Sequence, residues 1–338
     1  MEPTPIIPEK NAHDLAASFD RLDQPNVYTP AECERLAALM ARIQTLKRER
    51  NAVILAHNYQ RPEIFEVADF VGDSLELARQ GQQMPADVIV LCGVHFMAES
   101  AKILSPEKTV LIPDLRAGCS LADSVDPDEL VARRDELKKL YPDLQVVAYV
   151  NTTAAVKAVV DVCVTSANAV KIVEKLPTGH ILFVPDEHLA SYVQSETGKT
   201  IISWNGNCYV HHQITPENIL AVKDKMPDVK VLVHPECRSD VIALADAVLS
   251  TSGMVRYAKE SDAQEFLVVT ECGLSDKLLM EVPEKQFYKA CKLCQFMKMI
   301  TLDNVVSSLE NMQFKIEIDE DVRVAAAASL DRMLQLSK

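Results

Sequence analysis

Two cysteines in the last fifth of the chain have the spacing of a metal site or a redox dithiol. Cys291 and Cys294 form a C-x-x-C pair within the stretch KACKLCQFMKM. Zinc sites usually contain two such pairs, and the sequence has no second one. A thioredoxin-like dithiol would open a helix near the start of a βαβ unit, whereas this pair lies late, among lysines. The spacing alone therefore leaves the role of the pair open.

The other cysteines are spread along the chain without a local motif. Cys92 ends the apolar run VIVLC, and Cys208 follows the run TIISW; with Cys294 they are 116 and 86 residues apart. Nine cysteines, an odd number, without a secretory signal argue against a disulfide framework. We expect the remaining thiols to pack in the core, and among them Cys119 and Cys237 have the best case for another role. These packing residues are Cys33, Cys119, Cys163, Cys237 and Cys272.

Polar side chains also recur in pairs at the ends of apolar runs. The pairs are His57 and Tyr59, Tyr149 and Asn151, and His234 and Glu236. Because side chains two apart on a strand point to the same side, both members of each pair face one site. A hydroxyl residue follows each pair where a helix should begin: Ser74, Ser166 and Thr251. Each hydroxyl is predicted either to cap its helix or to bind an anion together with backbone N–H groups.

These residues belong to a pattern that occurs three times. The segments VADFVGDSLELA, VVDVCVTSANAV and LADAVLSTSGMV align at Asp69, Asp161 and Asp246, with the hydroxyl residue five positions later. Each Asp lies ten residues after the end of one predicted strand, and a second predicted strand follows each hydroxyl. The buried, valine-rich runs alternate with helical patterns, which is typical of parallel sheets. The sequence therefore predicts an α/β fold of three similar αβα units.

The expected organisation follows from this repeat. Residues 1–30 are polar and proline-containing and are expected to form a loosely held extension. Residues 31–115 form the first unit, 116–200 the second and 201–309 the third. The first unit begins with an amphipathic helix over 31–48. Residues 310–338 are expected to form a short strand, FKIEI, and a terminal helix, which are candidates to complete the first unit.

Composition excludes some classes of function. The formal net charge of -14 argues against nucleic-acid binding, which needs clustered lysine and arginine. No apolar run approaches the roughly 20 residues of a membrane span. The first residues, MEPTPIIPEK, resemble neither a secretory nor an organelle signal, so a cytoplasmic location is expected.

Several strings together resemble the quinolinate synthase family of de novo NAD biosynthesis. They are LAHNYQ, VADFVGDSLELA, CGVHFMAESAKIL, AYVNT, VHPEC, STSGM and CKLCQFMKMITL, in the family's order between about residues 40 and 310. The resemblance implies three αβα domains around a pseudo-threefold axis. It also implies a central [4Fe-4S] cluster with one cysteine ligand from each domain. By motif, those ligands are Cys92, Cys208 and Cys294, and the fourth iron stays open as a Lewis acid.

The resemblance further implies the reaction and the roles of the polar residues. The family, a transferase or lyase type of condensing enzyme, joins iminosuccinate to dihydroxyacetone phosphate and releases quinolinate, phosphate and water. An L-aspartate oxidase supplies the iminosuccinate and is the expected transient partner. His57, Tyr59, His234 and Glu236 are candidates for acid–base catalysis. His57, His234, Glu236, Tyr149, Asn151, Ser74, Ser166, Thr251 and His211 are expected to bind substrate.

Some alternatives stay open at this stage. A zinc- or thiol-dependent hydrolase or lyase on the same scaffold would bind zinc and survive air. An iron–sulfur sensor would carry a cluster without a pocket for small anions. A radical enzyme that uses S-adenosylmethionine would need a C-x-x-x-C-x-x-C loop, which the sequence lacks. Some members of the family carry a longer cysteine run, but this chain has Tyr288 at its first position, which argues against a thiol switch in that run; a Cys291–Cys294 disulfide that releases the cluster stays open as an alternative.

Overall fold

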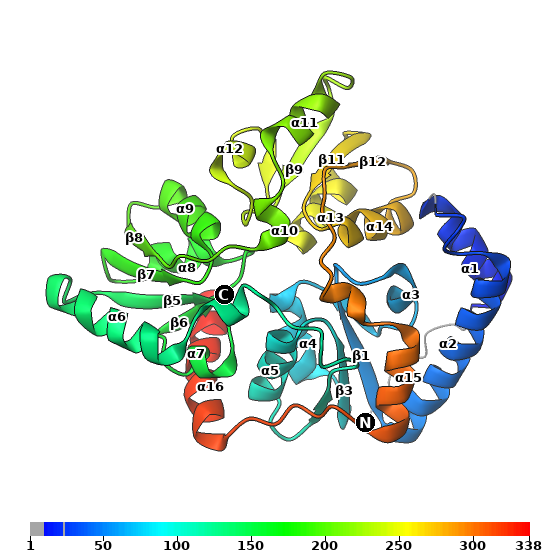
Figure 1. Ribbon diagram of the computed structural model, residues 1–338, viewed down its shortest axis with the longest axis horizontal. Helices are drawn as coiled ribbons and strands as arrows, with labels where there is room; N and C mark the ends of the chain where they lie inside the picture. The colour runs from blue at the N-terminus through cyan, green and yellow to red at the C-terminus, as the bar shows by residue number, and fades with distance from the viewer. Residues whose placement is uncertain (1–9, 23) are drawn as a thin grey trace.

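Three parallel sheets form the framework of the protein. The computed structural model describes residues 10–22 and 24–338, and this part of the chain contains three four-stranded sheets. Figure 1 shows them as three units grouped around a common centre, the first in blue and cyan, the second in green and the third in yellow to orange. Their strand orders, β2-β1-β3-β4, β6-β5-β7-β8 and β10-β9-β11-β12, are equivalent. The predicted α/β architecture of three αβα units is confirmed.

Each sheet has helices around it. The first unit contains β1 (Ala52–His57), α3 (Pro62–Phe65), β2 (Phe70–Gly72), α4 (Ser74–Gln83), β3 (Val88–Cys92), α5 (His95–Leu104) and β4 (Thr109–Leu111). The second contains α6 (Pro127–Leu140), β5 (Gln145–Tyr149), α7 (Ala154–Lys157), β6 (Val162–Val164), α8 (Ala169–Lys175), β7 (His180–Val184), α9 (Glu187–Glu196) and β8 (Thr200–Ser203). The third contains α11 (Pro216–Lys223), β9 (Lys230–Val233), α12 (Ser239–Ile242), β10 (Ala247–Val248), α13 (Thr251–Glu260), β11 (Glu265–Val269), α14 (Cys272–Glu281) and β12 (Gln286–Lys289). Because β8 extends to Ser203, the second sheet continues beyond the boundary expected at residue 200.

The remaining elements connect or cover the three units. They are α1 (Ala12–Phe19), α2 (Pro30–Arg50), α10 (Tyr209–His212), α15 (Leu302–Asn311) and α16 (Glu320–Leu336), with short 3-10 turns at η1 (Asp20–Leu22), η2 (Ala122–Ser124) and η3 (Met297–Met299). None of the helices in the described ranges is long and apolar enough to cross a membrane.

The repeated aspartates fasten an edge strand to a central strand in each unit. Asp69 Oδ2 accepts the backbone N–H of Ile54 at 2.7 Å, and its own N–H donates to the Ile54 carbonyl at 2.8 Å. Asp161 with Val146 and Asp246 with Val231 make the same pair of hydrogen bonds. A hydrogen bond to a charged group contributes about 1.5–3 kcal/mol. The threefold sequence repeat therefore marks one structural position, used three times.

The N-terminal residues are more ordered than the sequence suggested. Residues 1–9 of the expected extension lie outside the described residues. Residues 12–19 form α1, which begins with a capping box at Asn11 and packs against α2. Leu15 and Phe19 are fully buried there, and the Phe19 ring lies 4.2 Å from the Tyr28 ring. The prediction of a loose segment was wrong over these residues, because two turns with a few apolar side chains suffice to anchor a helix on an existing core.

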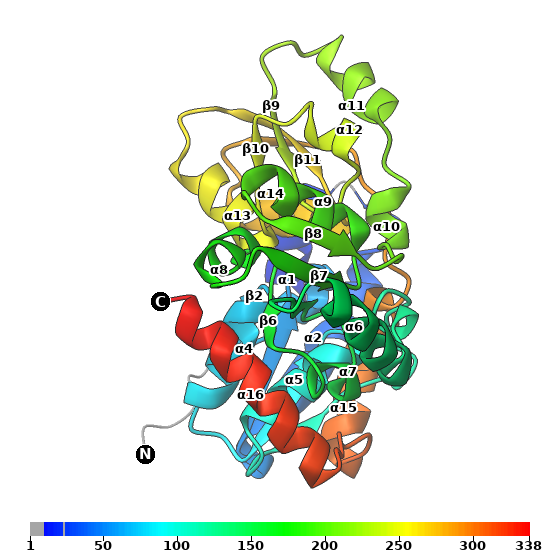
Figure 2. The same cartoon turned by 90° about the vertical axis from the view of Figure 1, so that its left-hand side faces the viewer.

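The C-terminal segment contacts two units. Residues 314–316 pair with β4 by hydrogen bonds from Ile112 N–H to the Phe314 carbonyl and from Ile316 N–H to the Val110 carbonyl. The predicted strand FKIEI is reduced to this single bridge, because Phe314 has a left-handed backbone with φ of 61°. Helix α16 packs on α7 and β6 of the second unit and also on α5 of the first, as Figure 2 shows.

Candidate functional site

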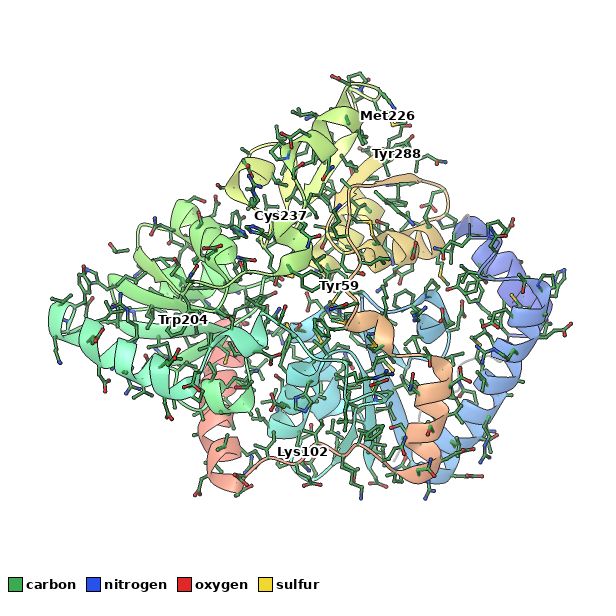
Figure 3. All side chains as sticks on the ribbon, viewed as in Figure 1. Tyr59, Lys102, Trp204, Met226, Cys237 and Tyr288 are labelled. Atoms are coloured by element: carbon green, nitrogen blue, oxygen red, sulfur yellow. A yellow bond between two sulfur atoms is a disulfide. The ribbon has the colours of Figure 1, made fainter. Side chains whose placement is uncertain are left out.

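A cavity lies where the carboxyl ends of the three central strands meet. Residues from all three units line it, and Tyr59, labelled in Figure 3, lies in this central region. The cavity has a volume of about 70 Å³, which is room for several waters or a small polar ligand. Its wall includes every residue expected at the site except Cys92. These are His57, Tyr59, Ser74, Tyr149, Asn151, Ser166, Cys208, His211, His234, Glu236, Thr251 and Cys294.

His57 and His234 occupy equivalent positions in the first and third units. The Nδ1 atom of His57 accepts the backbone N–H of Tyr59 at 3.2 Å, and that of His234 accepts the N–H of Glu236 at 3.4 Å. Burial lowers the pKa of each ring to about 3; repulsion from His234 adds to the shift of His57 and repulsion from His211 to that of His234, while Glu236 acts in the opposite direction on both. Both rings are therefore neutral and carry their proton on Nε2, from which each can donate to a ligand.

A chain of hydrogen-bonding groups connects Tyr59 with Glu236. The Tyr59 hydroxyl lies 2.6 Å from Thr270 Oγ1, which lies 2.8 Å from His211 Nε2. His211 Nδ1 lies 2.7 Å from Glu236 Oε2. One consistent arrangement of protons runs from Tyr59 to Thr270, from Thr270 to His211 and from His211 to the carboxylate. Such a chain can move a proton along its length.

Glu236 is the buried charge at the centre of this arrangement. Burial opposes its ionisation, but His211 and His234 outweigh burial and hold the pKa of Glu236 at about 2. The Asn151 amide donates to Glu236 Oε1 at 3.3 Å. Among the described residues, the buried Asn151 Oδ1 has no protein partner, so a ligand in the cavity would satisfy it. Burial, with the Glu236 charge adding, raises the pKa of Tyr149, so that hydroxyl stays protonated as a donor.

Three hydroxyl residues line the cavity, and none of them is the N-cap of its helix, which was one of the two roles expected for them. The N-cap of α4 is Asp73, one residue before Ser74, and the N-cap of α13 is Ser250, one residue before Thr251. Ser166 precedes α8, whose N-cap is Asn168. Of the two roles expected for these hydroxyls, capping is therefore excluded, because Asp73 and Ser250 cap the helices beside Ser74 and Thr251 and α8 starts beyond Ser166, whereas anion binding stays a prediction. The consequence is that the hydroxyls are not committed to capping.

Thr251 is held by a buried polar network behind the cavity. Its Oγ1 accepts from the Asn58 amide at 2.8 Å, and Asn58 Oδ1 accepts from the Lys277 ammonium at 2.6 Å. Burial lowers the pKa of Lys277, while Glu281 at 3.3 Å favours its charged form. Sequence analysis missed Asn58, Lys277 and Thr270. Only the position of Thr270 at the end of the strand run FLVVT could have indicated it.

The cysteines that surround the cavity differ from the expected set. Cys119, Cys208 and Cys294 all line it and are partly exposed, whereas Cys92 is fully buried in the hydrophobic core. Burial raises the pKa of Cys119 to about 12, and the charge of nearby Cys294 adds to that shift. Burial and Glu236 raise the pKa of Cys208, with Cys119 contributing too. All three thiols have raised pKa values because burial disfavours their charged thiolate forms. A cationic group bound between them would offset that cost, so the three thiols fit a group that binds thiolates.

The segment that carries Cys294 is fixed from two directions. The Cys294 backbone N–H donates to Glu271 Oε1 at 3.0 Å, and Lys298 lies 3.2 Å from the same carboxylate oxygen. Cys291 forms a disulfide with Cys272 at the start of α14. The structure therefore contradicts both the packing role predicted for Cys272 and the pairing of Cys291 with Cys294. Sequence spacing cannot show that a residue 19 positions away lies alongside Cys291.

The other predicted packing cysteines behave as expected. Cys33 and Cys163 are fully buried in the main core, and Cys163 Sγ lies 3.3 Å from Ser329 Oγ. Cys237 is buried in a smaller apolar cluster of the third unit. The structure thus separates packing thiols from cavity thiols: Cys119 lines the cavity although packing was expected, and Cys92 packs in the core although it was expected at the site.

Comparison with known proteins identifies the family of the chain. The family model described as quinolinate synthetase A protein matches residues 41–335. The chain is 52% identical over 300 residues to quinolinate synthase 1 of Methanosarcina acetivorans, covering 88% of this chain and 97% of that protein. It is 53% identical over 298 residues to quinolinate synthase of Dehalococcoides mccartyi, covering 88% and 97%. It is 49% identical over 292 residues to that of Xylella fastidiosa, covering 86% and 85%. The chain belongs to the quinolinate synthetase A family, which confirms the resemblance noted from its motifs.

Proposed function

We propose that the chain is a quinolinate synthase that condenses iminosuccinate with dihydroxyacetone phosphate. The products are quinolinate, one phosphate and two waters, in a step of de novo NAD biosynthesis. The observation that carries this proposal is one small cavity in which three thiols, three hydroxyl residues and the Tyr59–Glu236 relay converge. Family membership supports it, because the curated relatives carry the same name. The transferase or lyase type of condensation follows from the same reaction.

The cavity thiols are the proposed ligands of a [4Fe-4S] cluster. We assign Cys119, Cys208 and Cys294 to this role, and Cys119 replaces Cys92 because Cys92 points into packed core. Each of the three belongs to a different part of the chain, so the cluster would tie the units together. When bound through three thiolates, such a cluster supplies an open iron with Lewis-acid character.

Binding of the two substrates is assigned to the hydroxyl residues and the neutral histidines. Both substrates are anionic, and Ser74 and Thr251 stand in the first turns of α4 and α13, where backbone N–H groups point outward. Ser166 lies on the cavity wall two residues before Asn168, the N-cap of α8, and is assigned to substrate binding through its hydroxyl. His57 and His234 add neutral Nε2–H donors, so carboxylate and phosphate oxygens find partners without a buried cation.

Proton transfer is assigned to the relay. The condensation needs a proton taken from carbon next to a carbonyl and protons delivered to leaving oxygens. Glu236 is ionised and can accept a proton in the cavity, while Tyr59 is protonated and can donate one there, and Thr270 and His211 connect the two groups. Anionic substrates next to Glu236 will raise its pKa from the low value of the free protein, which makes it a stronger base when the site is filled.

The proposed substrate also suggests a partner. Iminosuccinate hydrolyses in water, so a short path from the enzyme that forms it is an advantage. We therefore retain an L-aspartate oxidase as the proposed transient partner, and no nucleic acid or membrane takes part.

The test is formation of quinolinate by oxygen-free enzyme supplied with dihydroxyacetone phosphate and freshly generated iminosuccinate. Quinolinate is expected only when both substrates are present. Cys294→Ser should abolish it, and the matched core variant Cys163→Ser should retain it. Quinolinate-free turnover of either substrate, or full activity in Cys294→Ser, would contradict the proposal.

A further inference from the structure

A second cluster of potential metal ligands lies outside the central cavity, where α9 begins. Glu187 and His188 form the first turn of α9, and His212 ends α10. One ligand atom from each lies within 4.8 Å of the other two. In the described part of the chain, none of the three belongs to the wall of the central cavity. The proposed reaction therefore leaves this cluster unexplained.

The two histidine rings face each other through their nitrogen atoms. His188 Nε2 lies 2.9 Å from His212 Nδ1, and the ring planes are inclined by only 17°. Two neutral imidazoles at this distance share one proton, and a metal ion can take the place of that proton. A tetrahedral ion with bonds of 2.0–2.1 Å separates its ligands by about 3.3 Å, so the rings need to part by about 0.4 Å. His212 is exposed, which leaves its ring free to make that adjustment.

The third ligand is oriented by the chain around it. Glu187 Oε1 lies 4.0 Å from His188 Nε2 and accepts a hydrogen bond from the Asn207 amide at 3.1 Å. The Glu187 backbone N–H donates to the Gly206 carbonyl at 2.8 Å. Carboxylates that bind metals are commonly held by such outer hydrogen bonds. The carboxylate is thus fixed on the side of the two rings that an ion would occupy.

We propose that Glu187, His188 and His212 bind a divalent cation of the zinc class, separately from the cavity thiols. Two imidazole nitrogens and one carboxylate suit zinc, nickel or copper, whereas magnesium and calcium prefer sites made of oxygen. On binding, the proton shared by the rings moves to the outer nitrogen of its own imidazole, so both inner nitrogens present lone pairs. Exposure of His212 leaves the fourth position open to water.

The position of this site connects it to the segment that carries Cys208. Asp186, next to Glu187, accepts the Cys208 backbone N–H at 3.2 Å. His212 directly follows His211, the central residue of the relay. An ion that joins α9 to α10 therefore braces the backbone on which a cavity thiol and the relay histidine stand. Occupancy should stabilise this segment without a contact to substrate.

The test is calorimetric titration of oxygen-free, cluster-bearing enzyme with Zn²⁺, with iron and sulfide measured before and after. One additional zinc per chain is expected, and the affinity should fall by more than ~100-fold in His212→Gln and in His188→Gln. Asn207→Ala should weaken binding by about tenfold through the loosened carboxylate. The matched control is His180→Gln, which removes another surface histidine paired with a carboxylate, at 2.8 Å from Asp143.

The zinc titration distinguishes a metal site from a simple hydrogen-bonded pair of histidines. Retained iron and sulfide, with zinc binding lost in both cluster variants and kept in His180→Gln, would support the site. Equal zinc affinity in the wild type and His212→Gln would overturn it. The absence of any zinc binding at about 0.1 mM Zn²⁺ would also overturn it, because the two rings would then only share a proton.

Discussion

Replacement of Glu236 by glutamine is the sharpest perturbation of the proposed proton relay. The substitution keeps the shape of the side chain and removes its negative charge. In the wild type this charge lies 2.7 Å from His211 Nδ1 and 3.5 Å from His234 Nδ1, with a side-chain exposure of only 4%. The uncharged amide can neither take a proton nor stabilise a cationic His211.

The expected size of the effect follows from these contacts. General acid–base catalysis by one positioned group contributes about 10²–10⁴ in rate. At about 1.4 kcal/mol for each factor of ten, that loss corresponds to about 3–5 kcal/mol in the activation free energy. The loss in folding stability should be smaller, about 1–3 kcal/mol, because glutamine still offers an oxygen to His211. Glu236→Gln should therefore lower kcat much more than it lowers stability.

The assay is quinolinate formation per cluster-bearing chain, combined with urea denaturation of the same preparations. Asp69→Asn is the matched control, because Asp69 is also a buried carboxylate, paired with Lys47 at 2.7 Å but remote from the cavity wall. It should lose stability and keep kcat. A Glu236→Gln enzyme within fivefold of the wild-type kcat, at equal cluster content, would refute the role assigned to the relay.

Three further predictions test separate parts of the structure. Thr270→Val should lower kcat by about tenfold, since it breaks a hydrogen-bond chain worth about 1 kcal/mol per link, whereas Thr270→Ser should restore it in the same steady-state assay. Cys272→Ser should lower the free energy of unfolding, measured in urea, by about 3 kcal/mol, because it removes the disulfide that links Cys272 to Cys291, 19 residues away. With reductant present, the wild type and the variant should be equally stable. The pKa of His57 is about 3 in the folded chain, below its ordinary value of 6.5. As pH falls from 6.5 toward 3, the ring takes up a proton only in the unfolded chain, so the folded state loses stability. The stability of the wild type relative to His57→Gln should drop by about 1.4 kcal/mol per pH unit between pH 6 and 4, and a constant difference would contradict the burial argument.

The threefold fold could be predicted because its signal is local. Asp69, Asp161 and Asp246 stand at fixed distances from apolar runs, and each carboxylate closes a contact within 15 residues, as between Asp69 and Ile54. The strand-end residue His57 was recognisable for the same reason, because strand periodicity decides which way such a side chain points, whereas Glu236 lies three residues beyond β9. Features that depend only on one strand and the turn next to it can therefore be predicted from the sequence.

The rest depends on contacts between distant segments. Cys92 was expected as a ligand from the motif CGVHFMAES of the family resemblance, but its side chain packs in the core; Cys119 reaches the cavity from an irregular loop. The bond between Cys272 and Cys291 arises because β11 and β12 are neighbours in one sheet, which brings the residues that follow them together. The choice of Asp73 over Ser74 as a cap depends on backbone details that residue preferences do not resolve.

The measurement that tests the central claim most directly is the content of iron and acid-labile sulfide per chain, on protein purified without oxygen. Wild type and Cys92→Ser should each contain about four of both, and Cys119→Ser should contain little of either. A full cluster in Cys119→Ser with none in Cys92→Ser would contradict the ligand set that the cavity defines. Zinc without sulfide in the wild type would contradict the iron–sulfur chemistry itself.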